Sequence, residues 1–414
     1  MIDITRKESC CGCGACEQIC PQNCISLIAD YEGFLYPSVN KKECTNCHLC
    51  EKVCPVLNQD SERFPLKVLA AYNMNDNVRS ESSSGGIFSI VAEEVIKQNG
   101  IVFGVKFDKN WNVAFDHTDN INGIKPYRGS KYVQARIDNN YKLVKKYLEI
   151  GKLVLFTGTP CQIAGLRTFL RKDYDNLILM DLICEGVPSP KIWKRYLYEE
   201  IERQCNIRYK IPFKQVEIKS ISFRNKDNGW DNFGFSFTLS KKSDNSGKEE
   251  ILPTYTSRKS AYLQAMFHYL DLRPICYECP FKSCKSHSDI TIADYWGIHI
   301  LHPEIYDNKG TSMVYLHTSK GQHFLPTNKI KYIETTYREA WGANNIITSV
   351  NKHPRRDIFF SRIDETSSII KLLERNTISL KKRIAKELLS ICLPPKIYQF
   401  IQEWIWKQRR KSRW

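Results

Sequence analysis

Residues 10–21 read CCGCGACEQICP, and residues 44–55 read CTNCHLCEKVCP. Each stretch holds four cysteines in the spacing C-x2-C-x2-C-x3-C, followed directly by proline. Soft thiolates at this short spacing wrap a loop around an iron-sulfur cube, and the proline turns the chain away. The repeat therefore predicts two 4Fe-4S clusters near the N-terminus, bound by Cys10, Cys13, Cys16, Cys20, Cys44, Cys47, Cys50 and Cys54.

The doubled spacing is typical of bacterial two-cluster ferredoxins, in which each run gives three thiolates to one cluster and its fourth to the other. One cluster would use Cys10, Cys13, Cys16 and Cys54, and the second would use Cys44, Cys47, Cys50 and Cys20. Structural zinc is the alternative, but zinc uses two C-x2-C pairs rather than four cysteines ending in proline. Cys11 and Cys24 fit neither run, and we interpret them as packing residues with redox chemistry as the alternative.

Composition limits the class of protein. The chain has 414 residues and is 42% hydrophobic, so its length predicts two or three domains. Its seventeen cysteines fall mostly in metal-ligand spacings, and the N-terminus lacks an apolar signal segment. No apolar run approaches the about 18 residues that cross a bilayer. We expect a cytoplasmic protein, because thiolates and clusters need a reducing compartment.

Charge is unevenly distributed along the chain. The net charge is +16, yet residues 1–60 carry −3. An acidic cluster module on a basic body would help to steer charged redox partners. A solvated surface without such a role is the alternative for most of these lysines.

The expected fold is an α+β ferredoxin-like cluster module, followed by an α/β body with parallel strand-helix units and an antiparallel insertion. We place the module at 1–60, the two parts of the body at 61–150 and 151–330, and a helical basic tail at 331–414. In the first part of the body, a Ser/Gly turn precedes an amphipathic helix at 87–98 and a strand at 101–107.

Two strand-turn-helix units follow: strand 153–156 with helix 161–170, and strand 176–183 with helix 191–204. Successive units of this kind form a parallel crossover. It brings Cys161 and Cys184 to the carboxyl edge of the sheet, where open α/β sheets bind ligands. Short alternating strands between 216 and 256 predict the antiparallel insertion.

A third cysteine group, Cys276, Cys279 and Cys284, has the spacing C-x2-C-x4-C and lacks a fourth ligand. We expect a third 4Fe-4S cluster in the body, with Cys184 or Cys161 as the fourth ligand. Buried free thiols are the alternative.

Several segments of the body resemble, in order, the beta subunits of coenzyme F420-reducing hydrogenases and dehydrogenases. The segments are SSSGGIFS (82–89), RGSKYVQ (128–134), GTPCQIAGL (158–166), DLICEGVPSPKIW (181–193) and CYECPFK followed by SDITIADYWGI (276–298). The resemblance implies an iron-sulfur flavoprotein in which FAD exchanges electrons with clusters and passes hydride to or from a deazaflavin or another acceptor.

The resemblance also implies flavin contacts, and glycine-rich turns beside basic residues suit a pyrophosphate. The candidates are Ser84, Gly85, Gly86, Arg128, Ser130, Lys131, Tyr132, Gln134, Thr157, Gly158 and Thr159. Helix capping is the alternative for the turns, and packing is the alternative for Tyr132. Asp294, at the end of a strand, would contact flavin or substrate or else act as a cap.

These observations predict an oxidoreductase that moves electrons between 4Fe-4S clusters, FAD and a two-electron partner, either F420 or another substrate. Flavin converts the single electrons of clusters into pairs. The expected partners are reduced ferredoxin or a similar carrier, a small-molecule acceptor and a partner subunit. The alternatives are an electron-transfer subunit without a substrate site and a sensing protein whose clusters are structural.

The tail from Lys381 to Trp414 carries a net charge of +8 and several aromatic residues. It would suit peripheral contact with the inner face of an anionic membrane, with docking onto the protein's own core or a partner as the alternative. We expect no nucleic-acid binding, because no recognition module accompanies the charge.

Overall fold

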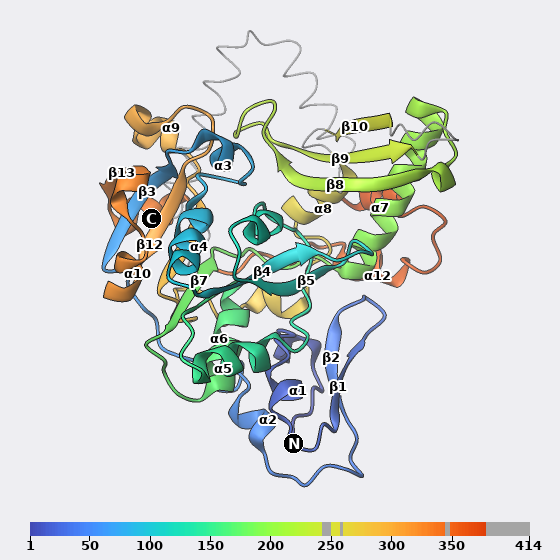
Figure 1. Ribbon diagram of the computed structural model, residues 1–414. Coiled ribbons are helices and arrows are strands. Elements are labelled where there is room, and N and C mark those ends of the chain that lie inside the picture. Colours follow the sequence, from blue (N-terminus) through green and yellow to red (C-terminus); the bar gives the residue numbers. More distant parts are fainter. Residues whose placement is uncertain (242–249, 257–259, 344–347, 378–414) are drawn as a thin grey trace.

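The computed structural model describes residues 1–241, 250–256, 260–343 and 348–377 (Figure 1). The basic tail from Lys381 onward lies outside the described residues. Among the helices that are described, none combines the length and apolar character needed to cross a membrane.

The N-terminal module consists of two short helices and one hairpin. The helices are α1 (Ala15–Ile19) and α2 (Leu49–Lys52), and the strands β1 (Ile25–Ala29) and β2 (Leu35–Val39) pair antiparallel. Its own buried core is small and mostly cysteine, consisting of Ile2, Cys20, Cys24, Ile25 and Cys50. Because this core buries little apolar surface, it contributes limited folding stability to the module. Bound clusters would contribute the remaining stability.

A mixed eight-stranded sheet forms the centre of the body, in the order β13-β3-β12-β11-β7-β6-β4-β5. The four central strands β11, β7, β6 and β4 are parallel, and the outer pairs are antiparallel. In sheet order the strands are Ile330–Thr335, Lys67–Asn73, Ser312–Leu316, Ile290–Asp294, Leu177–Leu182, Val154–Gly158, Ile101–Phe107 and Val113–Thr118.

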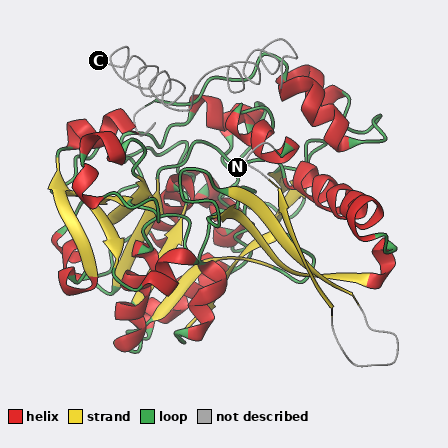
Figure 2. Ribbon diagram, turned by 90° about the horizontal axis from the view of Figure 1, so that it is seen from above, coloured by secondary structure: helices red, strands yellow, loops and turns green. Residues whose placement is uncertain are grey.

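Helices cover both faces of this sheet (Figures 1 and 2). On β6, Val154 and Phe156 belong to one apolar cluster and Leu155 to another, as expected for a central strand buried on both faces. The first cluster includes residues of α5 (Asn140–Glu149) and α6 (Pro160–Leu170), and the second includes residues of α4 (Ile87–Lys97).

A separate antiparallel sheet consists of β8 (Val216–Asn225), β9 (Gly234–Lys241) and β10 (Glu250–Thr256). Aromatic side chains attach it to the body: the rings of Phe223 on β8 and Trp193 lie 4.8 Å apart. Trp193 belongs to α7 (Pro190–Gln204), and the neighbouring α8 (Ala261–Phe267) and α13 (Ile369–Thr377) complete this layer. The remaining helices are α3 (Asp76–Ser80), α9 (Ile298–Leu301), α10 (Ser319–His323), α11 (Tyr337–Ala343) and α12 (Arg356–Ser361).

The secondary structure expected for the body is confirmed. Strands β6 and β7 are parallel neighbours, α6 and α7 follow them, and the insertion is antiparallel. Thr159 and Gln162 form a capping box that starts α6, which fixes the turn directly before Cys161.

Candidate functional site

Cysteines from both N-terminal runs meet beside the body, and we name Cys10, Cys13, Cys16 and Cys54 the proximal set. Burial raises the pKa of Cys16 above its ordinary range, and the nearby thiols of Cys10 and Cys54 raise it further. Burial also raises the pKa of Cys54, with Cys10 among the contributing neighbours. Three thiols of the first run therefore lie with the last thiol of the second run, as crossed ligation requires.

The remaining thiols of the two runs line a cavity together with Cys24. We name Cys20, Cys44, Cys47 and Cys50 the distal set. The main-chain N–H of Ile2 donates to Cys50 Sγ over 3.2 Å, and Cys24 Sγ lies 3.4 Å from Cys20 Sγ. Cys47 is exposed, so this set reaches the surface of the module.

Another cavity lies in the body at the carboxyl edge of the parallel strands. Its lining includes Cys161, Cys184, Cys276 and Cys279, which we name the body set. Cys161 lies in the first turn of α6, Cys184 follows β7, and the other two lie at a 3-10 helix (Pro274–Glu278). The prediction that Cys161 and Cys184 share one sheet edge is thus confirmed.

Contacts of the loops hold the body set in place. Gly186 has φ +125°, and a Cβ there would lie 3.1 Å from Cys276 Cβ and 2.5 Å from the Leu272 side chain. Only glycine allows this approach. The Gly186 N–H also donates to Cys184 Sγ over 3.4 Å, and Thr159 Oγ1 lies 3.2 Å from Cys161 Sγ.

The thiols of the body set influence one another electrostatically. Burial raises the pKa of Cys184 to about 12, and Cys161 contributes to the rise. Burial raises the pKa of Cys279 to about 11, again with a contribution from Cys161. The pKa of Cys276 is raised well above its usual value by burial and then by Cys184 and Cys279.

Cys284 lines the same cavity but has different neighbours. Burial raises its pKa to about 12, and the nearest contributing charges are Asp181 and Arg63 rather than cysteines. It packs in a separate apolar cluster with Tyr315 and Ile298. The thiols of Cys161 and Cys184 therefore group with those of Cys276 and Cys279, whereas the thiol of Cys284 does not.

Cys11 links the proximal set to the body set. The neighbouring thiols of Cys13 and Cys161 both shift the pKa of its buried thiol, and Cys11 also lines the body cavity. The interpretation of Cys11 as packing left out this bridging position, for which the sequence carries no signal beyond its place beside Cys10. The two cysteine sets thus lie in contact through one side chain.

The candidates for flavin contacts fall into three separate places. Ser83 Oγ lies 2.9 Å from Ser130 Oγ and accepts the Ser130 N–H over 2.6 Å, so the 82–86 turn and the 128–132 segment lie side by side. Within the first turn, a Cβ at Gly85 would lie 2.5 Å from the Ala71 carbonyl oxygen, so this glycine faces the sheet. Gly86 has φ +78° and precedes α4.

The turn at Thr157, Gly158 and Thr159 lies directly before Cys161 of the body set instead. Thr157 Oγ1 donates to the Phe103 carbonyl over 2.9 Å, and Thr159 caps α6 next to Cys161. Gln134 lies at the module, where its Nε2 donates to the Cys11 carbonyl over 3.1 Å.

A buried polar cluster joins the insertion to the two flavin-candidate segments. Arg224 on β8 forms a bidentate ion pair with Asp294, at 2.7 and 3.0 Å. The same guanidinium donates to Tyr132 Oη over 3.1 Å and to the Ser83 carbonyl over 3.2 Å. Asp294 also accepts from Trp230 Nε1 over 2.8 Å, so it is an ion-pair partner and not a helix cap.

Two lysines near these segments donate to main-chain carbonyls. Lys131 Nζ reaches the carbonyls of Pro126 and Arg128, and Lys226 Nζ reaches those of Arg79 and Ser84. Burial lowers the pKa of each lysine to about 7. Neither forms an ion pair with a carboxylate in the part of the chain that is described. An incoming anion would find two ammonium donors here.

Comparison with known proteins finds two matching domains in the chain. Residues 151–339 match the family model for the C terminus of the coenzyme F420 hydrogenase/dehydrogenase beta subunit, and residues 9–58 match a 4Fe-4S dicluster domain. Over residues 151–339 the chain is thus similar to the beta subunits of coenzyme F420 hydrogenases and dehydrogenases. The two matches together indicate an iron-sulfur protein related to electron-transferring oxidoreductases.

No curated protein matches the chain. Among solved structures, it matches a chain of a xenon derivative of the F420-reducing [NiFe] hydrogenase complex from Methanosarcina barkeri. The sequences are 15% identical, the match covers 76% of this chain and 91% of that chain, and the TM-score is 0.41.

Proposed function

We propose that this chain is an iron-sulfur flavoprotein oxidoreductase in which electrons pass between the N-terminal clusters, a body cluster and FAD. The observation that carries the proposal is the contact of Cys11 with both Cys13 and Cys161. Clusters bound by the proximal set and the body set would lie next to each other. Such a continuous series of redox centres suits electron transfer and has no purpose in a purely structural protein.

The body set is proposed as the ligand set of a third 4Fe-4S cluster. A cube presents four separate iron atoms, so its thiolates surround a cavity and need not meet at one point. Cys161, Cys184, Cys276 and Cys279 surround such a cavity.

The proposed FAD site lies where the 82–86 turn, the 128–132 segment and β8 meet. Its donor chemistry suits an anionic group, because Lys131 and Lys226 donate to neutral main-chain carbonyls and Arg224 Nε is buried without a hydrogen-bond partner among the described residues. Gly129 has φ +79° and open space at its Cβ position, which leaves main chain accessible. When bound, FAD would convert single electrons into a hydride equivalent.

Electrons would enter from reduced ferredoxin or a similar carrier at the distal set, because Cys47 is exposed there. The reverse direction is equally allowed, since cluster potentials span about −700 to +450 mV. The two-electron acceptor or donor would be F420 or another small molecule. The remaining expected partner is a second protein subunit.

The test is anaerobic purification followed by iron, sulfide and released-flavin analysis of the same full-length sample. We expect about twelve irons and about one flavin per chain, as three cubes and one FAD require. About eight irons after full reconstitution would refute the body cluster. Clusters without flavin, after FAD has been offered, would refute the flavoprotein and leave an electron-transfer subunit.

A further inference from the structure

Arg273 lies wholly buried where the N-terminal module meets the body. Its Nε donates to the Cys10 carbonyl over 2.7 Å, and its Nη2 donates to the Leu35 carbonyl over 2.8 Å. Its Nη1 donates to Gln134 Oε1 over 2.9 Å. One guanidinium from the body thus holds both the first cysteine loop and the hairpin of the module.

The charge of Arg273 has no carboxylate partner among the described residues. Three other buried arginines do have one: Arg79 pairs with Asp307, Arg224 with Asp294, and Arg356 with Glu32. A buried cation that keeps its charge at every pH is costly without a compensating anion. A negatively charged iron-sulfur cluster bound beside Arg273 would supply the compensating anion.

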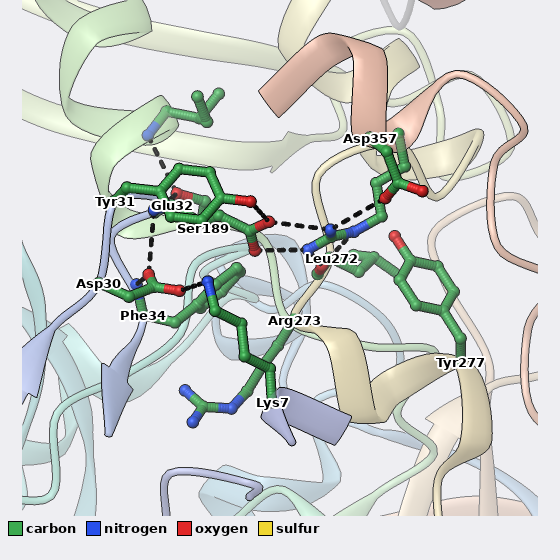
Figure 3. A network of polar contacts seen from close by, with 12 residues as sticks. Lys7, Asp30, Tyr31, Glu32, Phe34, Ser189, Leu272, Arg273, Tyr277 and Asp357 are labelled. Carbon is green, nitrogen blue, oxygen red and sulfur yellow. Dashed lines mark hydrogen bonds and ion pairs between the residues drawn. The ribbon is translucent and has the colours of Figure 1, made fainter. Parts of the chain in front are cut away.

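The position of the guanidinium supports this explanation. Arg273 Nη2 lies 3.5 Å from Cys10 Sγ, within range of an N–H···S hydrogen bond. A Cβ at Gly12, within the same loop, would lie 2.7 Å from Arg273 Nη1. The guanidinium also lies over the ring of Tyr36, 4.3 Å from its centroid, and Figure 3 shows Arg273 near Phe34.

We propose that Arg273 is a positioning residue that raises the reduction potential of the proximal cluster above that of the distal cluster. Reduction adds one negative charge to a cube, and a fixed positive charge with an N–H···S contact favours that charge. Electrons arriving at the distal cluster then collect on the cluster that faces the body. The inference rests on the proposed function only in taking the two N-terminal sets as cluster ligands.

The experiment is an EPR-monitored redox titration of the full-length protein with three variants. R273Q removes the charge. Q134E places a carboxylate against Arg273 and neutralises its field while the arginine stays in place. The control E32Q/R356Q removes another buried arginine of this junction together with its carboxylate, which accepts from Arg356 over 2.7 and 3.0 Å.

For R273Q and Q134E we expect the midpoint potential of one N-terminal cluster to fall, so that the oxidised-to-reduced ratio at a fixed potential rises about tenfold, or about 59 mV. The other N-terminal midpoint and both midpoints of the control stay unchanged. Hydrogen exchange of residues 9–58 reports whether the module remains docked in each variant.

Unchanged midpoints in a docked Q134E protein would overturn the proposal, even if R273Q fails to fold. An equal shift in the control would also overturn it, because loosened docking would then be the cause. Absence of a body cluster or of flavin would refute the proposed function and leave this test intact, since both titrated clusters belong to the module.

Discussion

Ion pairs and hydrogen bonds at single residues fasten the module to the body (Figure 3). The buried Glu32 of the hairpin accepts both Nη donors of Arg356, and Ser189 Oγ donates to the Glu32 carbonyl. Arg356 also donates to the Leu272 carbonyl over 2.8 Å. The segment around Leu272 therefore connects the hairpin, the body set and Arg273.

Asp271, beside that segment, is wholly buried, and its carboxyl oxygens accept no hydrogen bond from another described residue. Burial raises its pKa from 3.8 to about 7, although Arg356 partly offsets the rise. The pKa of Asp271 is therefore higher in the folded state than in the unfolded state. The contribution of protonated Asp271 to folding stability is complete below pH 3.8, declines as the pH rises and is lost above a pH of about 7.

We predict that ionisation of Asp271 lowers the free energy of unfolding by about 3 kcal/mol as the pH rises from 5 to 8. D271N removes this part of the pH dependence. Thermal melting of both proteins at the two pH values measures it, and the loss in Tm from pH 5 to pH 8 should be smaller in D271N. An identical loss in both proteins would contradict the prediction.

A second prediction at this scale concerns the ligands of the body cluster. C276A should lower the iron content by about four atoms per chain, because it removes a member of the body set. C284A is the matched control and should retain full iron content, because Cys284 packs among other residues. Loss of iron from C284A together with full iron in C276A would show that the ligand set is assigned incorrectly.

At the scale of the element, α6 positions both cysteine systems. Its first turn carries Cys161, and its Gly165 faces Cys13 of the proximal set. A Cβ at Gly165 would lie 2.8 Å from Cys13 Cβ and 2.9 Å from Tyr141 Oη. The glycine therefore allows the helix to pack directly against the module.

We predict that G165A lowers stability by about 1 kcal/mol or more. Alanine gains about 0.5–1 kcal/mol in helix propensity, but overpacking of this contact costs about 1–3 kcal/mol. Thermal melting of the cluster-loaded protein provides the measurement. A raised Tm would show that helix and module separate without cost.

Helix α6 also shows what local sequence predicts well. Its apolar spacing, its capping residues and the strands on either side all lie within about thirty consecutive residues. Its start, its end and its parallel neighbours agree with prediction for that reason. The contact with Cys13, about 150 residues earlier in the chain, has no local signature.

At the scale of the whole molecule, stability and redox chemistry depend on the same cysteines. The module has only a small core of its own, so much of its stability would come from bound clusters. The large sheet, by contrast, has an extensive apolar core on both faces. Metal loss should therefore affect the two parts unequally.

We predict that anaerobic removal of iron by a chelator increases amide exchange in residues 9–58 and in the 184–187 and 274–284 loops. Exchange in β3, β12 and β13 should stay unchanged, because these strands lie at the opposite side of the sheet from the module. Hydrogen exchange with mass spectrometry provides the measurement. Uniform loss of protection would indicate that the clusters hold the entire chain together.

The sequence by itself determined the cysteine runs and the strand-helix units and predicted crossed ligation, because ligand spacing and hydrogen-bond periodicity are properties of consecutive residues. It identified the segments proposed to bind flavin but not their neighbours. Only the tertiary structure placed Cys11 between two cysteine sets, separated Cys284 from the body set, and set Arg273 against Cys10 and Arg224 against Asp294. These contacts join residues far apart in the chain, and they depend on how the whole molecule packs.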